Sequence, residues 1–316
     1  MEQIVLSAIN GIVYGLLLFM VSAGLTLIFG MMGVLNFAHA SFYMIGAYTA
    51  YSLEGYFGFG TSIILSTLFV SALGVAMERW ILRRVHRFGH AHELLVTFGI
   101  AFIVAELIKS IFGNFPVNYA VPKSLEFPLF HIGSIEYPFY RVFMGGVALA
   151  MLAGLYLLLS RTRVGLIVRA AIYKPDMVSA LGHNVQRVFM LVVGVGAGLA
   201  GLAGAVAGAF YSTNPNMALD LGVMVFVVVV VGGLGSLPGA FIASLINGLL
   251  VSFSVMLDFS LNDILPHIGL AGLVTTQSDL MSLKISSVAA TLPFLLMLLV
   301  LLFKPAGLMG ETDEQQ

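Results

Sequence analysis

The chain has 316 residues, of which 59% are hydrophobic and only 9% are charged, and its mean hydropathy is +1.03. A soluble domain cannot bury that much apolar surface and still cover itself with polar groups, so this composition excludes a soluble fold. The net charge of −1 and the lack of a basic, aromatic-rich patch argue against nucleic-acid binding, and the absence of cysteine excludes disulfides.

The apolar runs are long and do not alternate with polar residues, which favours membrane-spanning helices over a β-barrel. A helix needs about 20 apolar residues to cross the hydrocarbon core, so we expect about eight or nine membrane helices or half-helices. The fold class is therefore an all-α polytopic membrane protein, with residues 1–316 as a single membrane domain. No basic segment precedes the first apolar run, so we expect a retained span rather than a cleaved signal.

The first predicted span is Ile4–Phe29. Residues Gly30–Tyr48 follow and are too apolar for a loop in water, yet they contain Gly30, Gly33, Asn36 and His39, which disfavour one continuous helix. Irregular backbone at membrane depth is tolerated where it is buried in protein or lines a cavity. We therefore expect a helix break here and a second span that ends near Leu53.

The middle of the sequence contains three further predicted spans, Thr61–Ile81, Leu94–Phe112 and Val142–Leu159. A polar turn, Glu78–His92, joins the first two of these spans, and a longer loop, Gly113–Tyr140, joins the last two. Within this loop, Ser124–Phe130 and His131–Tyr137 are predicted to form a small β-hairpin.

The sixth predicted span, Val188–Phe210, is rich in small residues, which let another helix approach closely. The seventh and eighth spans, Leu221–Val231 and Ala240–Leu257, are separated by a second glycine-rich break, Gly232–Gly239. Residues Asp258–Leu283 are amphipathic and predict a membrane-surface or re-entrant piece. The last predicted span is Ile285–Phe303.

Lysine and arginine are unequally divided between the two sets of loops. One side carries ten of the fourteen: Arg79, Arg83, Arg84, Arg87, Arg161, Arg163, Arg169, Lys174, Arg187 and Lys304. Since basic loops face the cytoplasm, the N-terminus is expected outside and the C-terminus inside.

Five residues around the first break reappear 202 positions later around the second: Gly30, Gly33, Leu35, Ala38 and Gly46 match Gly232, Gly235, Leu237, Ala240 and Gly248. Two related broken elements are typical of a transporter with a central pathway. Chance matching in a glycine-rich chain is the alternative. The candidate pathway residues are Gly30, Gly33, Asn36, His39, Gly232, Gly235 and Asn247. Asn36 and His39 can either line the passage or only satisfy backbone groups that the glycines free.

The longest polar interruption is Ser160–Arg187, which has 28 residues, five basic side chains and one acid. Pro175 suits the first turn of a helix, Asp176 favours its positive end, and Gly182 is a natural stop. These residues predict a short helix, Pro175–Leu181, that presents Met177, Val178 and Leu181 to a soluble partner. A structured loop kept only for topology is the alternative reading.

No pattern in the chain indicates an enzyme. His86, His90 and His92 lie beside Glu93 in a basic segment that we interpret as a solvated turn rather than a metal site. The glycines from Gly232 onward lack the Lys-Ser/Thr of a nucleotide-binding loop. Glu106 is three residues from Lys109, which predicts a local ion pair.

Several longer motifs resemble one family. The segment RAAIYKPDMVSALGHNVQRV (Arg169–Val188) looks like the cytoplasmic coupling segment of permeases in ABC importers. With GLTLIFGMMGVLNFAHASFYMIGAY (Gly24–Tyr48), LLVTFGIAF (Leu94–Phe102), GGLGSLPGAFIAS (Gly232–Ser244) and KPAGLMG (Lys304–Gly310), the chain resembles the LIV-type permease subunits of branched-chain amino acid importers. Ala40 and Ser41 depart from the residues frequent in that family, which leaves the exact solute open.

The resemblance implies a multi-pass subunit of the bacterial inner membrane that pairs with a second, similar permease, two cytoplasmic ABC ATPases and a periplasmic solute-binding protein. It implies no cofactor in this chain, with ATP-Mg bound by the ATPases. It also implies that Arg169, Ala170, Ala171, Ala180, Gly182 and Asn184 contribute to ATPase coupling, beside Pro175, Asp176, Val178 and Leu181 of the predicted helix. Alternatives are a permease for urea, amides or aromatic acids, and an ion-coupled secondary transporter.

Overall fold

The computed structural model describes residues 2–33, 35–132, 135–257 and 284–310, and within them almost all regular structure is helical. The long helices are α1 (Glu2–Met32), α2 (His39–Phe57), α3 (Phe59–Met77), α5 (His90–Phe112), α6 (Phe139–Arg161), α9 (Val185–Ala207), α10 (Met217–Gly232), α11 (Leu237–Met256) and α13 (Leu292–Phe303). Among the described residues, seven helices are long and apolar enough to cross a membrane, and α10 is a shorter apolar helix. The expected polytopic helical class is confirmed.

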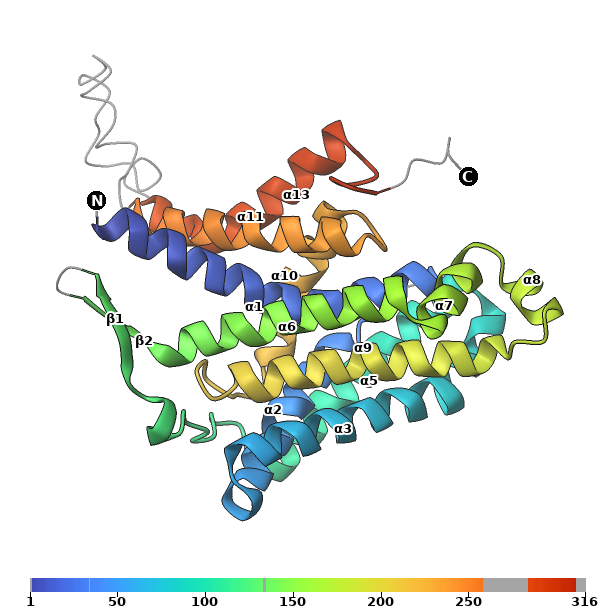
Figure 1. The fold of residues 1–316 in the computed structure, drawn as a ribbon, viewed down its shortest axis with the longest axis horizontal. Helices are drawn as coiled ribbons and strands as arrows, with labels where there is room; N and C mark the ends of the chain where they lie inside the picture. Colours follow the sequence, from blue (N-terminus) through green and yellow to red (C-terminus); the bar gives the residue numbers. More distant parts are fainter. Residues whose placement is uncertain (1, 34, 133–134, 258–283, 311–316) are drawn as a thin grey trace.

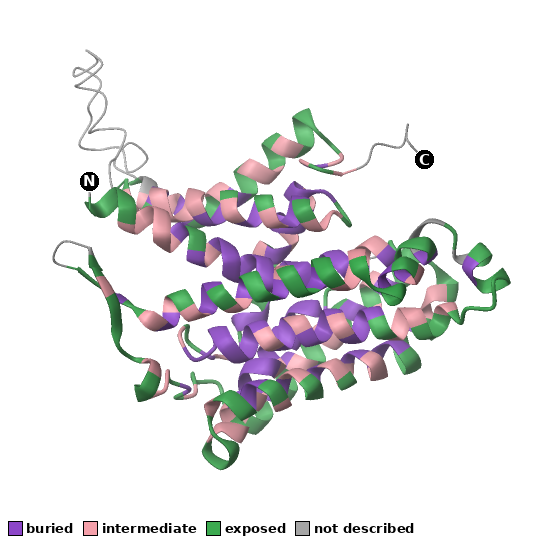
Figure 2. Ribbon diagram, viewed as in Figure 1, coloured by how far each residue is buried: buried purple, intermediate pink, exposed green. Residues whose placement is uncertain are grey.

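The first predicted span is confirmed as α1, which is one continuous helix despite its internal asparagine and glycines. Every residue from Gly15 to Ile28 is buried, so this helix is apolar on all sides and lies at the centre of the bundle. Figure 2 shows the buried residues concentrated on α1, α2 and α9, whereas the outer helices are mostly exposed. The exposed apolar side chains of α5, such as Leu95 and Ile103, then suit contact with lipid.

Glycines allow the central helices to pack at short distance. A Cβ built on Gly15 of α1 would lie 2.7 Å from the backbone oxygen of Ser244 in α11, and one on Gly201 of α9 would lie 2.7 Å from the Cβ of Val70 in α3. Real side chains do not approach so closely, so both helix pairs require glycine at these positions. The predicted role of the small residues of the sixth span is thereby confirmed.

The predicted polar turn Glu78–His92 is wrong, because most of this segment is helical. A π-helix (Glu78–Leu82), α4 (Arg83–Val85) and a 3-10 turn (His86–Phe88) continue α3, and α5 begins at His90. No glycine or proline interrupts the chain until Gly89, whose φ of +92° ends the helix. The segment is also not fully solvated, because Glu78 is 2% exposed.

The predicted β-hairpin is confirmed, although its strands begin and end later than expected. Strand β1 (Pro128–Ile132) pairs antiparallel with β2 (Ile135–Pro138). A short 3-10 turn, Lys123–Leu125, precedes β1. The register is irregular between Pro128 and Phe130.

The loop between α5 and α6 meets the loop between α9 and α10. The backbone N–H of Val117 donates to the oxygen of Thr213 at 3.0 Å. Nearby, the hydroxyls of Tyr119 and Tyr140 donate to the carbonyls of Ala205 and Val206 near the end of α9. These bonds satisfy carbonyl groups that a helix end leaves free.

The long helices have two distinct ends (Figure 1). The N-terminus and the hairpin lie at one end, and two short helices, α7 (Arg163–Tyr173) and α8 (Pro175–Ala180), lie at the other. The rings of His86 and Phe189 lie 6.0 Å apart, which places the basic segment after α3 at the same end as α8.

The last span begins as a 3-10 helix (Ile285–Thr291) and continues as α13. The predicted surface or re-entrant piece Asp258–Leu283 lies outside the described residues.

Candidate functional site

The first candidate site is the short helix α8, which has the ends that its sequence predicts. Pro175 occupies the first helical turn, and the chain leaves the helix through Gly182, whose φ is +88°. The N–H of Gly182 donates to Ser179 and the N–H of His183 donates to Val178, at 3.0 and 3.2 Å. This pair of bonds is the Schellman motif, in which a left-handed glycine closes a helix, so Gly182 fixes where α8 stops.

Neighbouring caps hold this segment in place on both sides. The Thr162 hydroxyl accepts from the N–H of Gly165 at the start of α7. The Asn184 side chain accepts from the N–H of Arg187 at the start of α9. Each cap satisfies an otherwise free N–H, so the two caps fix where α7 and α9 begin on either side of α8.

The expectation that Val178 is available to a partner is wrong. Val178 is 4% exposed and Ala171 is 2% exposed, and both belong to an apolar cluster with Met31 of α1 and Val192 of α9. These two side chains therefore attach the segment to the bundle. The outward surface consists instead of exposed side chains, which are Arg169, Ala170, Asp176, Met177, Ala180 and Leu181.

The second candidate site is the pair of helix breaks, which the structure brings together. A Cβ on Gly30 would lie 3.3 Å from the Cα of Gly235, so the two breaks touch through their backbones. Gly33 and Gly235 both have positive φ, at +67° and +84°. The repeat-related glycines after the breaks also contact helices, since Gly46 packs on Gly201 and Gly248 packs on α1.

Asn36 and His39 lie at the start of α2 and are 5% and 1% exposed. The Asn36 side-chain oxygen accepts from the N–H of Ala38, and the His39 Nε2 lies 3.1 Å from the oxygen of Val21 in α1. The second bond places the beginning of α2 beside the middle of α1. Part of each side chain is thus used to satisfy backbone groups, which is the second of the two roles predicted for Asn36 and His39.

The same two residues also line a cavity of about 200 Å³ between α2, α5 and α10. Its walls are mainly apolar, with Phe98, Phe102 and Phe226 among the side chains. The Nδ2 of Asn36 and the Nδ1 of His39 have no hydrogen-bond partner among the described residues. Such free polar atoms at the edge of an apolar cavity can orient a small solute by hydrogen bonding.

The other predicted pathway residues do not line this cavity. Gly30 and Gly235 form the contact between the breaks, and Gly33 lies in the bend before α2. Gly232 packs instead against the backbone of Gly239 and Ala240 at the start of α11. Asn247 is buried in α11, where its Nδ2 donates to Ala243 at 2.8 Å. Of the candidate pathway residues, Asn36 and His39 therefore line the cavity, whereas the others contribute to packing between helices or to the bends.

Two acidic side chains in the segment predicted to be a solvated turn are instead buried, at the end of the bundle that carries α8. Glu78 and Glu93 are each 2% exposed, and the Glu93 carboxyl group lies against the ring of His86. Glu78 follows Val70 and Gly74 at four-residue intervals on the buried face of α3, and this spacing could have indicated its burial. Among the described residues, no group of three His, Cys, Asp or Glu side chains could hold a metal ion. The predicted pair of Glu106 and Lys109 is confirmed, with 3.4 Å between its charged atoms.

Comparison with known proteins finds one family over nearly the whole chain. The sequence model described as branched-chain amino acid transport system / permease component matches residues 7–301. No solved structure is significantly similar to the chain.

The relatives have similar lengths. The high-affinity branched-chain amino acid transport system permease protein LivH of Salmonella typhimurium is 30% identical over 97% of this chain and 96% of its own. LivH of Escherichia coli K12 is 28% identical with the same coverage, and BraD of Pseudomonas aeruginosa is 25% identical over 98% of this chain and 96% of its own.

Proposed function

Since this chain belongs to the family of branched-chain amino acid transport system permease components, we propose that it forms part of the membrane pathway of an ATP-driven importer for branched-chain amino acids. The relatives' names support this cargo, because each describes a high-affinity branched-chain amino acid transport permease.

The proposed assembly contains a second, similar permease, two cytoplasmic ATPases and a periplasmic binding protein, in a bacterial inner membrane. The N-terminus faces outward and the C-terminus faces the cytoplasm, in keeping with the positive-inside distribution of basic residues. The end of the bundle that carries α8 then faces the ATPases, and the end that carries the hairpin faces the binding protein.

The ATPase contact in this proposal is the exposed surface of α7 and α8. One observation supports this contact. The helix α8 is a separate short helix that ends at Gly182, with Met177 61% and Leu181 78% exposed. Val178, on its other side, is buried against the bundle. A short helix with apolar side chains fits a groove on a partner. Its buried side is positioned to pass a displacement on to the membrane helices.

The proposed route of that displacement is α1. Val178 shares an apolar cluster with Met31 and Leu27 of α1, and the Val21 carbonyl of the same helix contacts His39. A movement of α8 would thus reach the start of α2, where Asn36 and His39 border the cavity between α2, α5 and α10. Closure of the ATPases on ATP is proposed to switch this region between outward-open and inward-open arrangements.

The cargo is tested by uptake into proteoliposomes that contain this chain, its permease partner and the ATPases, with the binding protein outside. Labelled leucine should be taken up, and excess isoleucine or valine should compete while urea and benzoate should not. Competition by urea, amides or aromatic acids alone would instead assign the permease to another solute class.

A further inference from the structure

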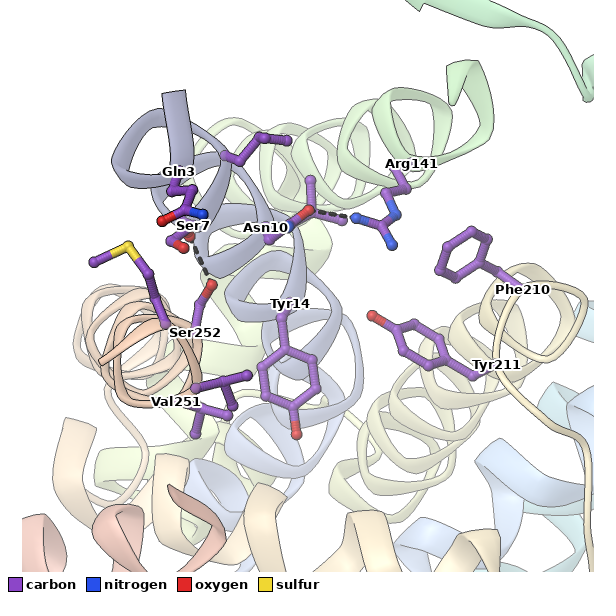
Figure 3. A pocket seen from close by; sticks show the side chains of 13 residues that line it. Gln3, Ser7, Asn10, Tyr14, Arg141, Phe210, Tyr211, Val251 and Ser252 are labelled. Carbon is purple, nitrogen blue, oxygen red and sulfur yellow. Dashed lines mark hydrogen bonds between the residues drawn. The ribbon is translucent and has the colours of Figure 1, made fainter. Parts of the chain in front are cut away.

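A second cavity, of about 430 Å³, lies at the hairpin end of the bundle, away from α8. Thirteen described side chains line it, from the first half of α1, the last half of α11, the start of α6 and the loop after α9. Figure 3 shows Asn10 and Tyr14 of α1 on one side and Phe210 and Tyr211 on the other. Its size falls within the range of about 300–1,000 Å³ that is usual for small-molecule sites.

One cation occupies the edge of this cavity. The Nη1 of Arg141 donates to the side-chain oxygen of Asn10, and the guanidinium lies over the rings of Phe210 and Tyr137, with 5.1 and 5.7 Å to their centres. These contacts fix the position of the guanidinium. Its Nε is buried and has no hydrogen-bond partner among the described residues.

No acid neutralises this arginine within the described part of the chain. None of the thirteen lining residues is Asp or Glu, and no carboxylate lies within ion-pair distance of Arg141 among the described residues. A positioned guanidinium with unused donors binds a carboxylate through parallel hydrogen bonds. The charge in this cavity therefore selects an anion.

The rest of the lining suits an aliphatic group. Val251 and Val255 of α11 and Leu6 and Val13 of α1 form an apolar wall. In Figure 3, Val251 lies across the cavity from Arg141, and the Tyr211 hydroxyl points into the space between them. A cation at one edge and an apolar wall at the other match a molecule with a carboxylate and a branched hydrocarbon chain.

We propose that this cavity is an outer binding site for an aliphatic amino acid, in which Arg141 holds the carboxylate and the wall of α1 and α11 holds the side chain. This inference rests on the proposed function for the identity of the cargo. The site takes the solute before it reaches the cavity beside His39, between α2, α5 and α10. Asn10 is a positioning residue, because it holds the guanidinium rather than the solute.

The test measures thermal unfolding of the purified full-length chain with L-leucine, 4-methylpentanoate or L-leucinamide. A ligand that binds only the folded state raises the unfolding temperature. Leucine and 4-methylpentanoate should stabilise the wild type, whereas leucinamide, which lacks the carboxylate, should not. Arg141→Met should weaken leucine binding at least tenfold, and Arg141→Lys should restore part of it. Lys109→Met removes a cation that belongs to a surface pair and should leave binding unchanged.

Arg141 also supports neighbouring rings, so a second variant separates binding from folding. Val251→Phe fills the opposite wall and should weaken binding of leucine more than binding of alanine. Stabilisation by leucinamide equal to that by leucine, or no stabilisation at about 50 mM leucine, would overturn the site. Wild-type binding of leucine without ATP-driven uptake would instead contradict the proposed function and leave the site standing.

Discussion

Gly30 and Gly235, which are far apart in the sequence, lie with their backbones in contact where the two helix breaks meet. A Cβ on Gly235 would lie 3.0 Å from the Cα of Gly30, and one on Gly30 would lie 3.3 Å from the Cα of Gly235. Each break thus limits the position of the other. We infer that this contact is the point where the end of α1 and the start of α11 move together during transport.

Gly235→Ala should disturb this contact in two ways. The residue has a φ of +84°, which costs an L side chain about 1 kcal/mol or more, and the added methyl also meets Gly30. Gly58→Ala is the matched control, because its φ is +77° but no atom lies within 4 Å of the added Cβ. The unfolding temperature should fall for both variants. Leucine uptake should fall much further for Gly235→Ala than for Gly58→Ala. Equal effects would mean that the contact between the breaks has no functional role.

Gly201→Leu should destabilise the bundle by separating α9 from α3. The new side chain would overlap Val70, and overpacking of this kind costs about 1–3 kcal/mol or prevents correct packing. Gly154→Leu in α6 has open space around its Cβ and should leave the unfolding temperature nearly unchanged. A similar loss of stability in both variants would contradict the close packing of α9.

Ala180→Glu should prevent association with the ATPases without affecting membrane insertion. Ala180 is exposed on α8, and a carboxylate there would have to be buried in the proposed groove without a partner. Ala91→Glu changes an exposed alanine in the first turn of α5 and should retain association. Co-purification with tagged ATPases measures the difference. Normal recovery of the ATPases with Ala180→Glu would remove α8 from the proposed interface.

Val178→Ala and Met177→Ala should separate attachment of α8 from partner binding. Val178 is buried, so its truncation should lower the free energy of unfolding by about 1–3 kcal/mol. Met177 is 61% exposed, so its truncation should leave stability unchanged and reduce solute-stimulated ATP hydrolysis. Unfolding curves and ATPase assays on the same preparations check both results. The opposite pattern would mean that α8 is attached to the bundle by its other face.

Local chemistry predicted much of this fold. The apolar runs predicted the spanning helices, and the positive-φ glycines Gly33 and Gly235 lie within the two predicted breaks. The predicted stop at Gly182 is confirmed by its Schellman bonds. These features depend on a few neighbouring residues and on backbone conformations that favour glycine, so a sequence pattern is sufficient to find them.

Features that depend on packing between distant segments were not predictable in this way. Burial of Val178 depends on Met31 and Val192, which lie in other helices. The Arg141 cavity needs four separate elements, whereas in the sequence Arg141 is only one more basic residue after the loop Gly113–Tyr140. Burial of Glu78 was missed because its basic neighbours suggested a solvated turn, although the helix continues through it.

We propose that this chain conducts its solute only when ATPases drive it. The most direct measurement is labelled leucine uptake into proteoliposomes that contain the permeases, with the binding protein outside, compared with and without the ATPases and ATP. Uptake should require both the ATPases and ATP, and it should be lost with Ala180→Glu. Uptake of equal rate without ATPases, or uptake driven by an ion gradient alone, would contradict it.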